Sequence, residues 1–538
     1  MTASNPQQDR KEFSPKGTKI VPGRASETVI KGGPRVRFAP SPTGPLHIGG
    51  VRTALYNYLF AKKHGGTFIL RVEDTDQQRY VPGAEEYIIE SLKWCGIEPD
   101  EGIPAGGPHA PYRQSERMDL YRENAMKLVE TGHAYIAFDT PEELDELRRE
   151  KEAGGGVFQY DHTVRNSLRN SLSLSASETE KMKNEGVPYV IRFRIPDNRE
   201  LKINDIVRGE VTVNTSTLDD KVLFKADGMP TYHLANITDD YMMEITHVIR
   251  GEEWLPSLPL HVLLYEAFGW QDNMPLFAHL PLLLKPSGQG KLSKRDGDKL
   301  GFPVFPLQWE DHSTGEISSG YRESGYFPGA FVNLLALLGW NPGTEREIFS
   351  INELSEAFSL DRVHKSGARF DPDKAKWFNH QYLMAADIKD VASAFAEIVA
   401  EKGFQTDMGK LEVICSLVRE RAHFVGEIWD QASFFFERPR SYDEKLVRKK
   451  WKEETPGLLE RVIKLLEELP EYDAESLSDK VKGYLEKEGI GLGNVMIPVR
   501  LALVGEGKGP DLFAIIELLG RKETIERIRL AIEKIKAI

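Results

Sequence analysis

The strongest constraint on the fold comes from the first periodic segment of the chain, where a short strand-like run meets a cluster of prolines. Residues 35–39 (RVRFA) stop at residues 40–45 (PSPTGP), which can continue neither a strand nor a helix. A helical pattern follows over residues 47–63 and ends at the glycine pair 65–66, as helices commonly do. Residues 67–72 (TFILRV) then have the composition of a buried strand. This order of strand, turn, helix and strand predicts a parallel α/β sheet.

The rest of the 538-residue chain is long enough for several further domains. Charged helical stretches such as Pro141–Ala153 and a polar patch at residues 166–177 predict an inserted, partly mobile domain. The α/β character returns over residues 222–250, and a loop-rich stretch is predicted over residues 285–329. From about Leu383 the sequence is almost entirely helical. The last helix carries an apolar stripe of four isoleucines: Ile525, Ile528, Ile532 and Ile535.

Composition limits the functions open to the chain. No apolar run approaches the roughly 20 residues that a membrane helix needs, so we expect no membrane partner. Cys95 and Cys415 lie far apart without metal-type spacing, which favours a reduced, cytoplasmic setting. The net charge of −13 weighs mildly against nucleic-acid binding, although it does not exclude one basic face. Residues 1–31 are polar and lack the apolar block of a secretory signal, so we expect a disordered, dispensable extension.

The sharpest motif is RFAPSPTGPLHIGG at residues 37–50. Its small residues allow a ligand to approach the backbone closely, and the N-terminus of the following helix offers free N–H groups to a phosphate. His47 would add a donor to the same phosphates. A proline-rich turn with an incidental histidine is the alternative, and a bare His-Ile-Gly would favour that alternative. The whole stretch favours a phosphate site.

A second motif is GKLSKR at residues 290–295, which follows an apolar run. Two lysines and a serine on a mobile loop can hold a triphosphate and neutralise the negative charge that develops on the transferred group. An ordinary solvated basic loop is the alternative. The position of this motif after the second α/β segment favours the phosphate interpretation.

Together these motifs resemble the two signatures of class I aminoacyl-tRNA synthetases, and the chain is most similar to the bacterial-type glutamyl-tRNA synthetase family. The similarity extends from about Arg35 to the C-terminus and is densest in the first half. Further matches follow in order at residues 70–76, 107–109 with 112–117, 227–236 and 248–254. Several independent motifs in the correct order are far more specific than any one of them.

The resemblance implies roles for individual residues. The glutamate pocket is expected to contain Arg37, Ala39, Ser41, Glu73, Tyr232, Asn236 and Arg250. ATP is expected to be bound by Gly44, His47, Gly49, Gly50, Glu253, Lys291, Ser293 and Lys294, of which His47, Lys291 and Lys294 are catalytic. The helical half is expected to contact tRNA through Arg419, Arg421, Arg448 and Lys449, although a solvated helix face is the alternative.

Residue chemistry agrees with the pocket. Glu73 can pair with the ammonium of an amino acid, and a side-chain carboxylate suits a planar guanidinium, for which Arg250 and Arg37 are the candidates. Glu73 could instead form a scaffold pair with Arg37 or Arg71. Tyr232 and Asn236 could belong to a polar core.

Three departures from the family pattern affect these expectations. Gly50 stands where the first motif usually has a second histidine, and Leu292 and Arg295 differ mildly from the second motif. Some relatives hold zinc in the inserted domain through cysteines and histidine. This chain has no cysteine between Cys95 and Cys415, so we expect no structural zinc and no metal ligands.

The implied fold is a Rossmann-type parallel-sheet catalytic domain with an α+β insertion, followed by an all-α anticodon-binding region. The expected divisions are an extension (1–34), a catalytic domain in two halves (35–110 and 221–284), an inserted acceptor-stem-binding domain (111–220), a connecting domain with the lysine loop (285–382) and the anticodon-binding region (383–538). The implied reaction forms a glutamyl-adenylate from L-glutamate and ATP with Mg²⁺, and then charges tRNA(Glu). The family further implies dependence of activation on bound tRNA, and we expect a monomer.

Four alternatives remain open at this point. A glutaminyl-tRNA synthetase shares the first motif, but Arg250 and the helical C-terminal half argue against it. A short paralogue that attaches glutamate to a modified base lacks an anticodon domain, whereas this chain has a large helical C-terminal region. A non-catalytic tRNA-binding paralogue should have lost His47 or the lysines, and a generic nucleotidyltransferase would not need the helical half.

Overall fold

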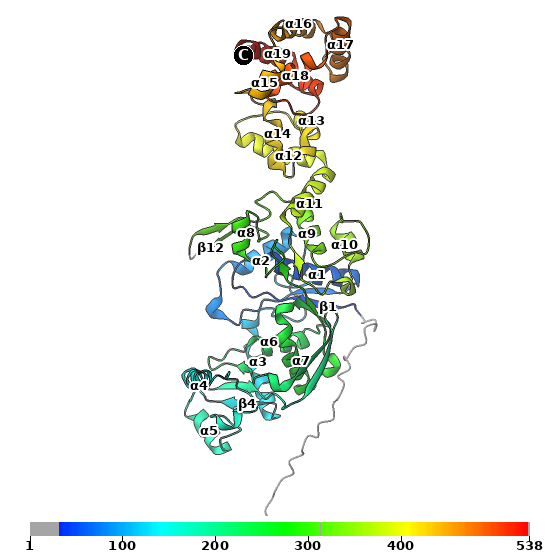
Figure 1. The fold of residues 1–538 in the computed structure, drawn as a ribbon. Coiled ribbons are helices and arrows are strands. Elements are labelled where there is room, and N and C mark those ends of the chain that lie inside the picture. The colour runs from blue at the N-terminus through cyan, green and yellow to red at the C-terminus, as the bar shows by residue number, and fades with distance from the viewer. Residues whose placement is uncertain (1–31, 312–313, 536–538) are drawn as a thin grey trace, which may run out of the picture. The chain divides into compact units, whose positions relative to one another are not determined.

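The computed structural model describes residues 32–311 and 314–535, and the chain forms two compact units (Figure 1). The first unit comprises Met1–Ser324 and Phe331–Pro372, and the second comprises Gly325–Ala330 and Asp373–Ile538. The expected disordered extension lies almost entirely outside the described residues. The finer division of the first unit into domains stays a prediction.

The first unit begins with a parallel three-stranded sheet in the order β1-β2-β3. Its strands are β1 (Arg35–Phe38), β2 (Thr67–Leu70) and β3 (Glu101–Gly102), and α1 (Ile48–Lys63) connects β1 to β2. The predicted strand, turn, helix and strand are therefore confirmed. The two strands end one or two residues earlier than predicted, although backbone hydrogen bonds from Arg71 to Phe38 and from Glu73 to Pro40 continue between the two segments.

A second sheet in the order β7-β6-β10-β9 adjoins the first. The strands β6 (Glu200–Asp205), β10 (Leu276–Leu280) and β9 (His247–Gly251) are parallel, and β7 (Gly209–Asn214) pairs antiparallel with β6. The backbone N–H of Thr246 donates to the carbonyl oxygen of Arg35 at 2.9 Å, which joins β9 to the edge of β1. Parallel strands bring their carboxyl ends to one edge, which is where α/β proteins bind ligands.

The inserted segment has its own antiparallel sheet, β4 (Ala134–Ala137), β5 (Val190–Phe193) and β8 (Val222–Phe224). The helix predicted at Pro141–Ala153 is present as α4, because Thr140 and Glu143 form a capping box and proline occupies its first turn. Strands and helices in this segment confirm an α+β insertion. The other helices of the first unit before residue 285 are α2 (Ala84–Trp94), α3 (Met118–Glu130), α5 (Ala176–Asn184), α6 (Tyr232–Met242) and α7 (Leu258–Ala267).

The stretch at residues 285–329 is less loop-rich than predicted. It contains the short helix α8 (Lys294–Leu300) and a hairpin of β12 (Trp309–Asp311) and β13 (Glu316–Ser318). Three-residue strands carry too few residues to show an alternating pattern, so sequence periodicity could not reveal the hairpin. The neighbouring elements are β11 (Leu283–Leu284), paired with β14 (Ala368–Arg369), and the helices α9 (Pro328–Leu337) and α10 (Ile351–Ala357).

The second unit is helical throughout its described part, as predicted. Ile525, Ile528 and Ile535 are buried in its apolar core, and Ile532 packs against that core. The helices, most of which appear in yellow to red in Figure 1, are α11 (Pro372–Ala385), α12 (Ile388–Glu401), α13 (Met408–Val418), α14 (Ile428–Ala432), α15 (Glu444–Lys450), α16 (Thr455–Glu468), α17 (Ala474–Lys487), α18 (Gly493–Val504) and α19 (Leu512–Lys534). Across the described residues we find no helix with the length and apolar character that crossing a bilayer requires.

Candidate active site

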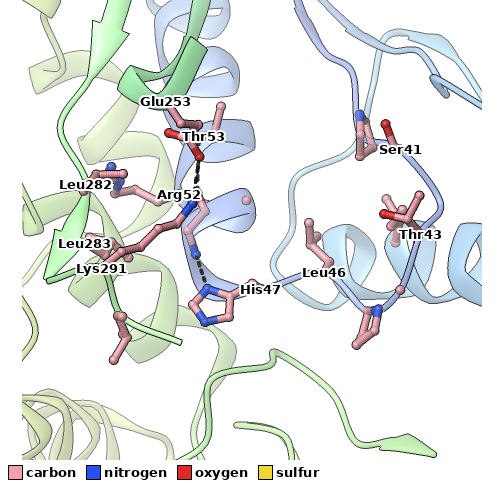
Figure 2. A pocket seen from close by; sticks show the side chains of 18 of the residues that line it. Ser41, Thr43, Leu46, His47, Arg52, Thr53, Glu253, Leu282, Leu283 and Lys291 are labelled. Carbon is pink, nitrogen blue, oxygen red and sulfur yellow. Dashed lines mark hydrogen bonds and ion pairs between the residues drawn. The ribbon is translucent and has the colours of Figure 1, made fainter. Parts of the chain in front are cut away.

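A cavity of about 450 Å³ opens where β1 ends and α1 begins. Figure 2 shows His47 between Ser41 and Thr43 on one side and Lys291 on the other. The cavity brings together most of the residues predicted to bind ATP: Gly44, His47, Gly49, Gly50, Glu253 and Lys291. Residues from the two motifs, which are more than 200 positions apart in the chain, therefore face one space.

His47 is the N-cap of α1, and its Nδ1 accepts a hydrogen bond from the backbone N–H of Gly49 at 3.2 Å. Because Nδ1 accepts, the proton of the neutral ring resides on Nε2. Nε2 is buried and has no hydrogen-bond partner among the described residues. Burial, with a smaller contribution from the Lys291 charge, lowers the pKa of His47 to about 4. At neutral pH, His47 is thus an uncharged donor with an unused N–H. The first backbone N–H groups of α1 are not free as expected, because Ile48 donates to the carbonyl oxygen of Val304 at 3.0 Å and Gly49 donates to His47.

Lys291 contributes a positive charge at the far wall of the cavity, where its Nζ lies 3.1 Å from Oε1 of Glu253. Ser293 does not line the cavity, because its hydroxyl donates to Asp296 at 2.5 Å where α8 begins. The side chain of Lys294 lies outside what the structure describes, so its predicted role stays a prediction. Gly50 leaves room for Leu46, since a Cβ at position 50 would lie 2.6 Å from Cδ1 of Leu46.

Of the residues predicted to bind the amino acid, Arg37, Glu73, Asn236 and Arg250 have buried polar side chains, and Tyr232 is half-buried. Ser41 is exposed, and it alone of the predicted set lines the cavity. Ala39 directly follows β1 and precedes Pro40, which is a lining residue. Arg71 and Asn236 both donate to Oε1 of Glu73, at 3.0 and 2.9 Å. Burial raises the pKa of Glu73, and the neighbouring Arg71 opposes that rise. No described residue donates to Oε2 of Glu73, so that oxygen can accept a hydrogen bond from a ligand.

Arg37 is one of two arginines predicted to meet a side-chain carboxylate, and the structure gives it another partner. Its Nε and Nη2 donate to the two carboxylate oxygens of Asp240, at 3.0 and 3.2 Å. Arg71 donates to the same carboxylate at 2.8 Å. The charge of Arg37 is therefore already paired. Asp240 is a residue that sequence reasoning missed, because nothing in its local sequence signals that it meets β1.

Arg250 is buried, with 5% of its surface exposed, yet it forms no ion pair with a carboxylate in the described part of the chain. Its guanidinium donates to the Tyr232 hydroxyl at 2.8 Å and to Nε2 of His279 at 3.0 Å. Longer contacts reach Nδ1 of His261 and the carbonyl oxygen of Trp254, both at 3.4 Å. All of these partners are neutral acceptors. Burial accordingly lowers the pKa of Arg250, and an anionic ligand would supply the missing charge.

Of the neutral residues around Arg250, Tyr232 was among the predicted pocket residues, whereas His261 and His279 were not. His261 interrupts the apolar run of α7 and His279 that of β10, and these interruptions were the available signal. Trp254 packs on the ring of Tyr232 with centroids 4.3 Å apart. Burial is the main cause that raises the pKa of Tyr232 to about 12, so its hydroxyl stays protonated at neutral pH.

The residues predicted to contact tRNA all lie in the second unit. Arg421, Arg448 and Lys449 are exposed, whereas Arg419 is half-buried and donates to the carbonyl oxygen of Ala386 at 3.2 Å. Their role in tRNA binding stays a prediction. In residues 32–311 and 314–535 there is no group of three or more histidine, cysteine or acidic side chains placed to hold a metal ion.

Comparisons with known proteins agree with this site. Residues 34–377 match the family described as tRNA synthetases class I (E and Q), catalytic domain, and residues 380–532 match an anticodon binding domain. Glutamate--tRNA ligases of Porphyromonas gingivalis and Flavobacterium johnsoniae are 59% and 60% identical, and each match covers 93% of this chain and 98% of the relative. The crystal structure of a glutamate tRNA ligase from Elizabethkingia meningosepticum, in complex with its amino acid, superimposes with a TM-score of 0.91 at 56% identity, over 94% of this chain and all of that one. The chain therefore belongs to the class I tRNA synthetases for glutamate and glutamine, and within them to the glutamate--tRNA ligase family.

Proposed function

We propose that this chain attaches L-glutamate to tRNA(Glu) at the expense of ATP, through a glutamyl-adenylate. The observation that carries the choice of amino acid is Arg250, a buried guanidinium whose partners are all neutral. A glutamate side chain supplies the missing negative charge, whereas the amide of glutamine does not. A glutaminyl-tRNA synthetase would leave this charge uncompensated.

The amino acid is held by two charges in this proposal. Its ammonium meets Oε2 of Glu73, while Arg71 and Asn236 fix the other carboxylate oxygen. Its side-chain carboxylate meets Arg250. The α-carboxylate is then left to face the cavity, where Ser41 lies with the phosphate-binding residues. Two fixed ends orient the reacting group, which lowers the entropic barrier of the first step.

In the first step, an α-carboxylate oxygen of glutamate attacks the α-phosphorus of ATP. An oxygen–phosphorus bond forms, the bond to the β-phosphate oxygen breaks, and pyrophosphate leaves with the electron pair. ATP enters as its Mg²⁺ complex. Nε2–H of His47 and the ammonium of Lys291 donate to phosphate oxygens as their charge grows, and the positive end of the α1 dipole lies beside them. No side chain of the protein forms a covalent bond.

In the second step, a hydroxyl of the terminal ribose of tRNA attacks the carbonyl carbon of the adenylate. The ester bond forms and AMP leaves. We assign acceptor-stem binding to residues 111–220 and anticodon binding to the second unit, with Arg419, Arg421, Arg448 and Lys449 as contacts. The proposed enzyme acts as a monomer in the cytoplasm, and light scattering during gel filtration tests its oligomeric state.

Aminoacylation of purified tRNA(Glu) and tRNA(Gln), with glutamate and with glutamine, tests the proposal directly. We expect glutamate on tRNA(Glu), and the same assay measures whether tRNA(Gln) is also charged. Pyrophosphate exchange with and without tRNA tests whether activation requires it. Charging with glutamine in preference to glutamate would overturn the assignment.

A further inference from the structure

The partner of Arg250 at its Nε is His279, and His279 in turn contacts a buried carboxylate. Nδ1 of His279 lies 2.6 Å from Oδ2 of Asp205, and its Nε2 accepts from Nε of Arg250 at 3.0 Å. His279 and Asp205 are 0% and 3% exposed, so both side chains are shielded from bulk solvent. Asp205, His279 and Arg250 lie at the carboxyl ends of the neighbouring strands β6, β10 and β9.

The hydrogen bonds determine where the protons reside. Oδ1 of Asp205 accepts from the backbone N–H groups of Val207 and Arg208, at 3.0 and 2.8 Å, which fixes the carboxylate in place. Oδ2 can then only accept from His279, so Nδ1 of the ring carries the proton. Nε2 is therefore the acceptor that the Nε–H of Arg250 requires.

We propose that Asp205 and His279 form a positioning pair that holds Arg250 by its Nε and thereby determines selection of the glutamate side chain. With Nε engaged, the guanidinium plane is fixed. Nη2, whose one printed contact is at 3.4 Å to the carbonyl oxygen of Trp254, is left to meet the carboxylate. Asp205 lies one strand beyond His279. It therefore orients the imidazole ring without forming an ion pair with Arg250. This inference rests on the proposed function, because it concerns the same glutamate pocket.

Asp205→Asn is the sharpest test, since it keeps the shape of the side chain. The amide oxygen can still accept from the two backbone N–H groups, but the amide nitrogen then donates to Nδ1 of His279. The ring proton moves to Nε2 and opposes the Nε–H of Arg250. We expect KM for glutamate to rise by up to about 100-fold, as displacements of about 1 Å can cause, with KM for ATP unchanged. The preference for glutamate over glutamine should fall as well.

A pair of substitutions at His279 keeps the proposal testable if Asp205→Asn does not fold. His279→Gln retains an acceptor for Arg250, whereas His279→Leu removes it. Both variants should raise KM for glutamate, and we expect the rise to be much smaller in His279→Gln than in His279→Leu. Equal losses in the two variants would overturn the positioning role.

Asp220→Asn is the matched control for loss of a buried carboxylate. Asp220 is fully buried, accepts from the backbone N–H of Ile195 at 3.0 Å and from Tyr135 at 2.6 Å, and lies in the inserted segment. The Asp220→Asn substitution should lower the melting temperature without changing KM for glutamate. An equal rise in glutamate KM in this control, or an unchanged KM in folded Asp205→Asn, would overturn the inference. If the wild-type chain does not charge glutamate at all, the proposed function itself fails, which the first assay reveals.

Discussion

At the residue scale, the charge of Arg250 makes the strongest prediction. Removing one partner of a desolvated charge pair costs about 2–5 kcal/mol, or roughly 30-fold to several thousand-fold in kcat/KM. Arg250→Ala should lose that much glutamate activity and little ATP affinity. Arg250→Cys should also shift the relative preference toward glutamine, because an amide would no longer meet an unpaired cation. Measurement of kcat/KM for both amino acids checks this.

A control separates this effect from damage to the fold. Arg165 is also a buried arginine, but it pairs with Asp220 at 3.0 Å in the inserted segment. Arg165→Ala should lower the melting temperature and keep the ratio of glutamate to glutamine activity. An unchanged ratio in a well-folded Arg250→Ala would show that Arg250 only braces its neighbours.

Lys291 is the lysine of the second motif whose side chain the structure describes, and its removal should affect ATP chemistry alone. A charge-assisted hydrogen bond to phosphate contributes about 1.5–3 kcal/mol, so Lys291→Ala should slow adenylate formation roughly 10- to 150-fold. Lys299→Ala on α8, an exposed lysine that does not line the cavity, is the control. Pyrophosphate exchange and tRNA binding are the readouts. A collapse of tRNA affinity with unchanged exchange would assign Lys291 to tRNA instead.

The same residues show what sequence could reveal of the site. His47 and Lys291 were predictable because each belongs to a local motif whose turn and small residues have a physical reason. Asp240, His261 and His279 were not, because their importance arises only when α6 packs against β1 and when α7 and β10 pack beside β9. Sequence identified both Arg250 and Arg37 as candidates for a carboxylate. Only the packing of Asp240 against Arg37 distinguishes them.

At the scale of one element, His47 has two roles in α1 that substitutions can separate. Its Nδ1 caps the helix, and its Nε2–H faces the cavity. His47→Asn keeps an acceptor for the N–H of Gly49 but lacks the second donor. We expect it to retain the melting temperature of the wild type and to lose about 10²–10³-fold in adenylate formation, as removal of one preorganised donor does.

His47→Ala is the comparison that makes this test decisive. It loses both the cap and the donor, so it should slow adenylate formation similarly and also cost about 1 kcal/mol of stability. Calorimetry and pyrophosphate exchange on both variants give the two quantities. Near-wild-type exchange in a folded His47→Asn would show that the histidine serves α1 alone.

Elements differed in how well the sequence predicted them. The helix α4 was predicted from end to end because Thr140, Pro141 and Glu143 mark its start and Gly154 follows its end. In contrast, α8 and the hairpin of β12 and β13 were not predicted. The helix has seven residues and each strand has three, which is too short for a helical or alternating pattern to show. In the hairpin, Trp309 and Ser318 are buried, so it depends on tertiary packing.

At the scale of the whole molecule, buried histidines should make folding stability sensitive to acid. Burial is the main cause that lowers the pKa of His233 to about 4, below its ordinary value of 6.5. Between these values the unfolded chain binds a proton that the folded chain does not. Stability is therefore fully present above about pH 6.5 and is lost toward pH 4, by roughly 1.4 kcal/mol per pH unit for one such group.

Urea unfolding at several pH values between 7.5 and 4.5 measures this loss. His233→Gln removes one titrating group and should flatten the dependence, because the other ionisable groups are the same in both proteins. A variant whose stability falls as steeply as that of the wild type would show that His233 takes up its proton in the folded state.

The two units cannot be separated by one cut in the chain. Residues 325–330 belong to the second unit, where the buried Asn379 accepts from the backbone N–H of Phe327 at 2.8 Å and donates to the carbonyl oxygen of His423 at 2.7 Å. A fragment that ends near Leu383, the predicted boundary, would expose these partners and the core side of α11. Substitutions in the full chain therefore test the role of the second unit better than truncation.

Charge reversal of the exposed basic residues Arg421, Arg448 and Lys449 is the substitution we would make. If they meet tRNA phosphates, the triple glutamate variant should raise KM for tRNA, and each lost contact should reduce the salt dependence of binding by about one unit of logarithmic slope. The triple reversal of Arg461, Lys464 and Lys480, which are also exposed in this unit, imposes the same change in net charge. This second triple variant should raise KM for tRNA less. The first variant removes local contacts to phosphates, whereas the second changes only the overall charge. KM for glutamate and ATP should be unchanged in both, since those substrates bind in the first unit. Equal losses of tRNA affinity in the two triple variants would show that net charge alone acts, and would remove these three residues from the tRNA-binding surface.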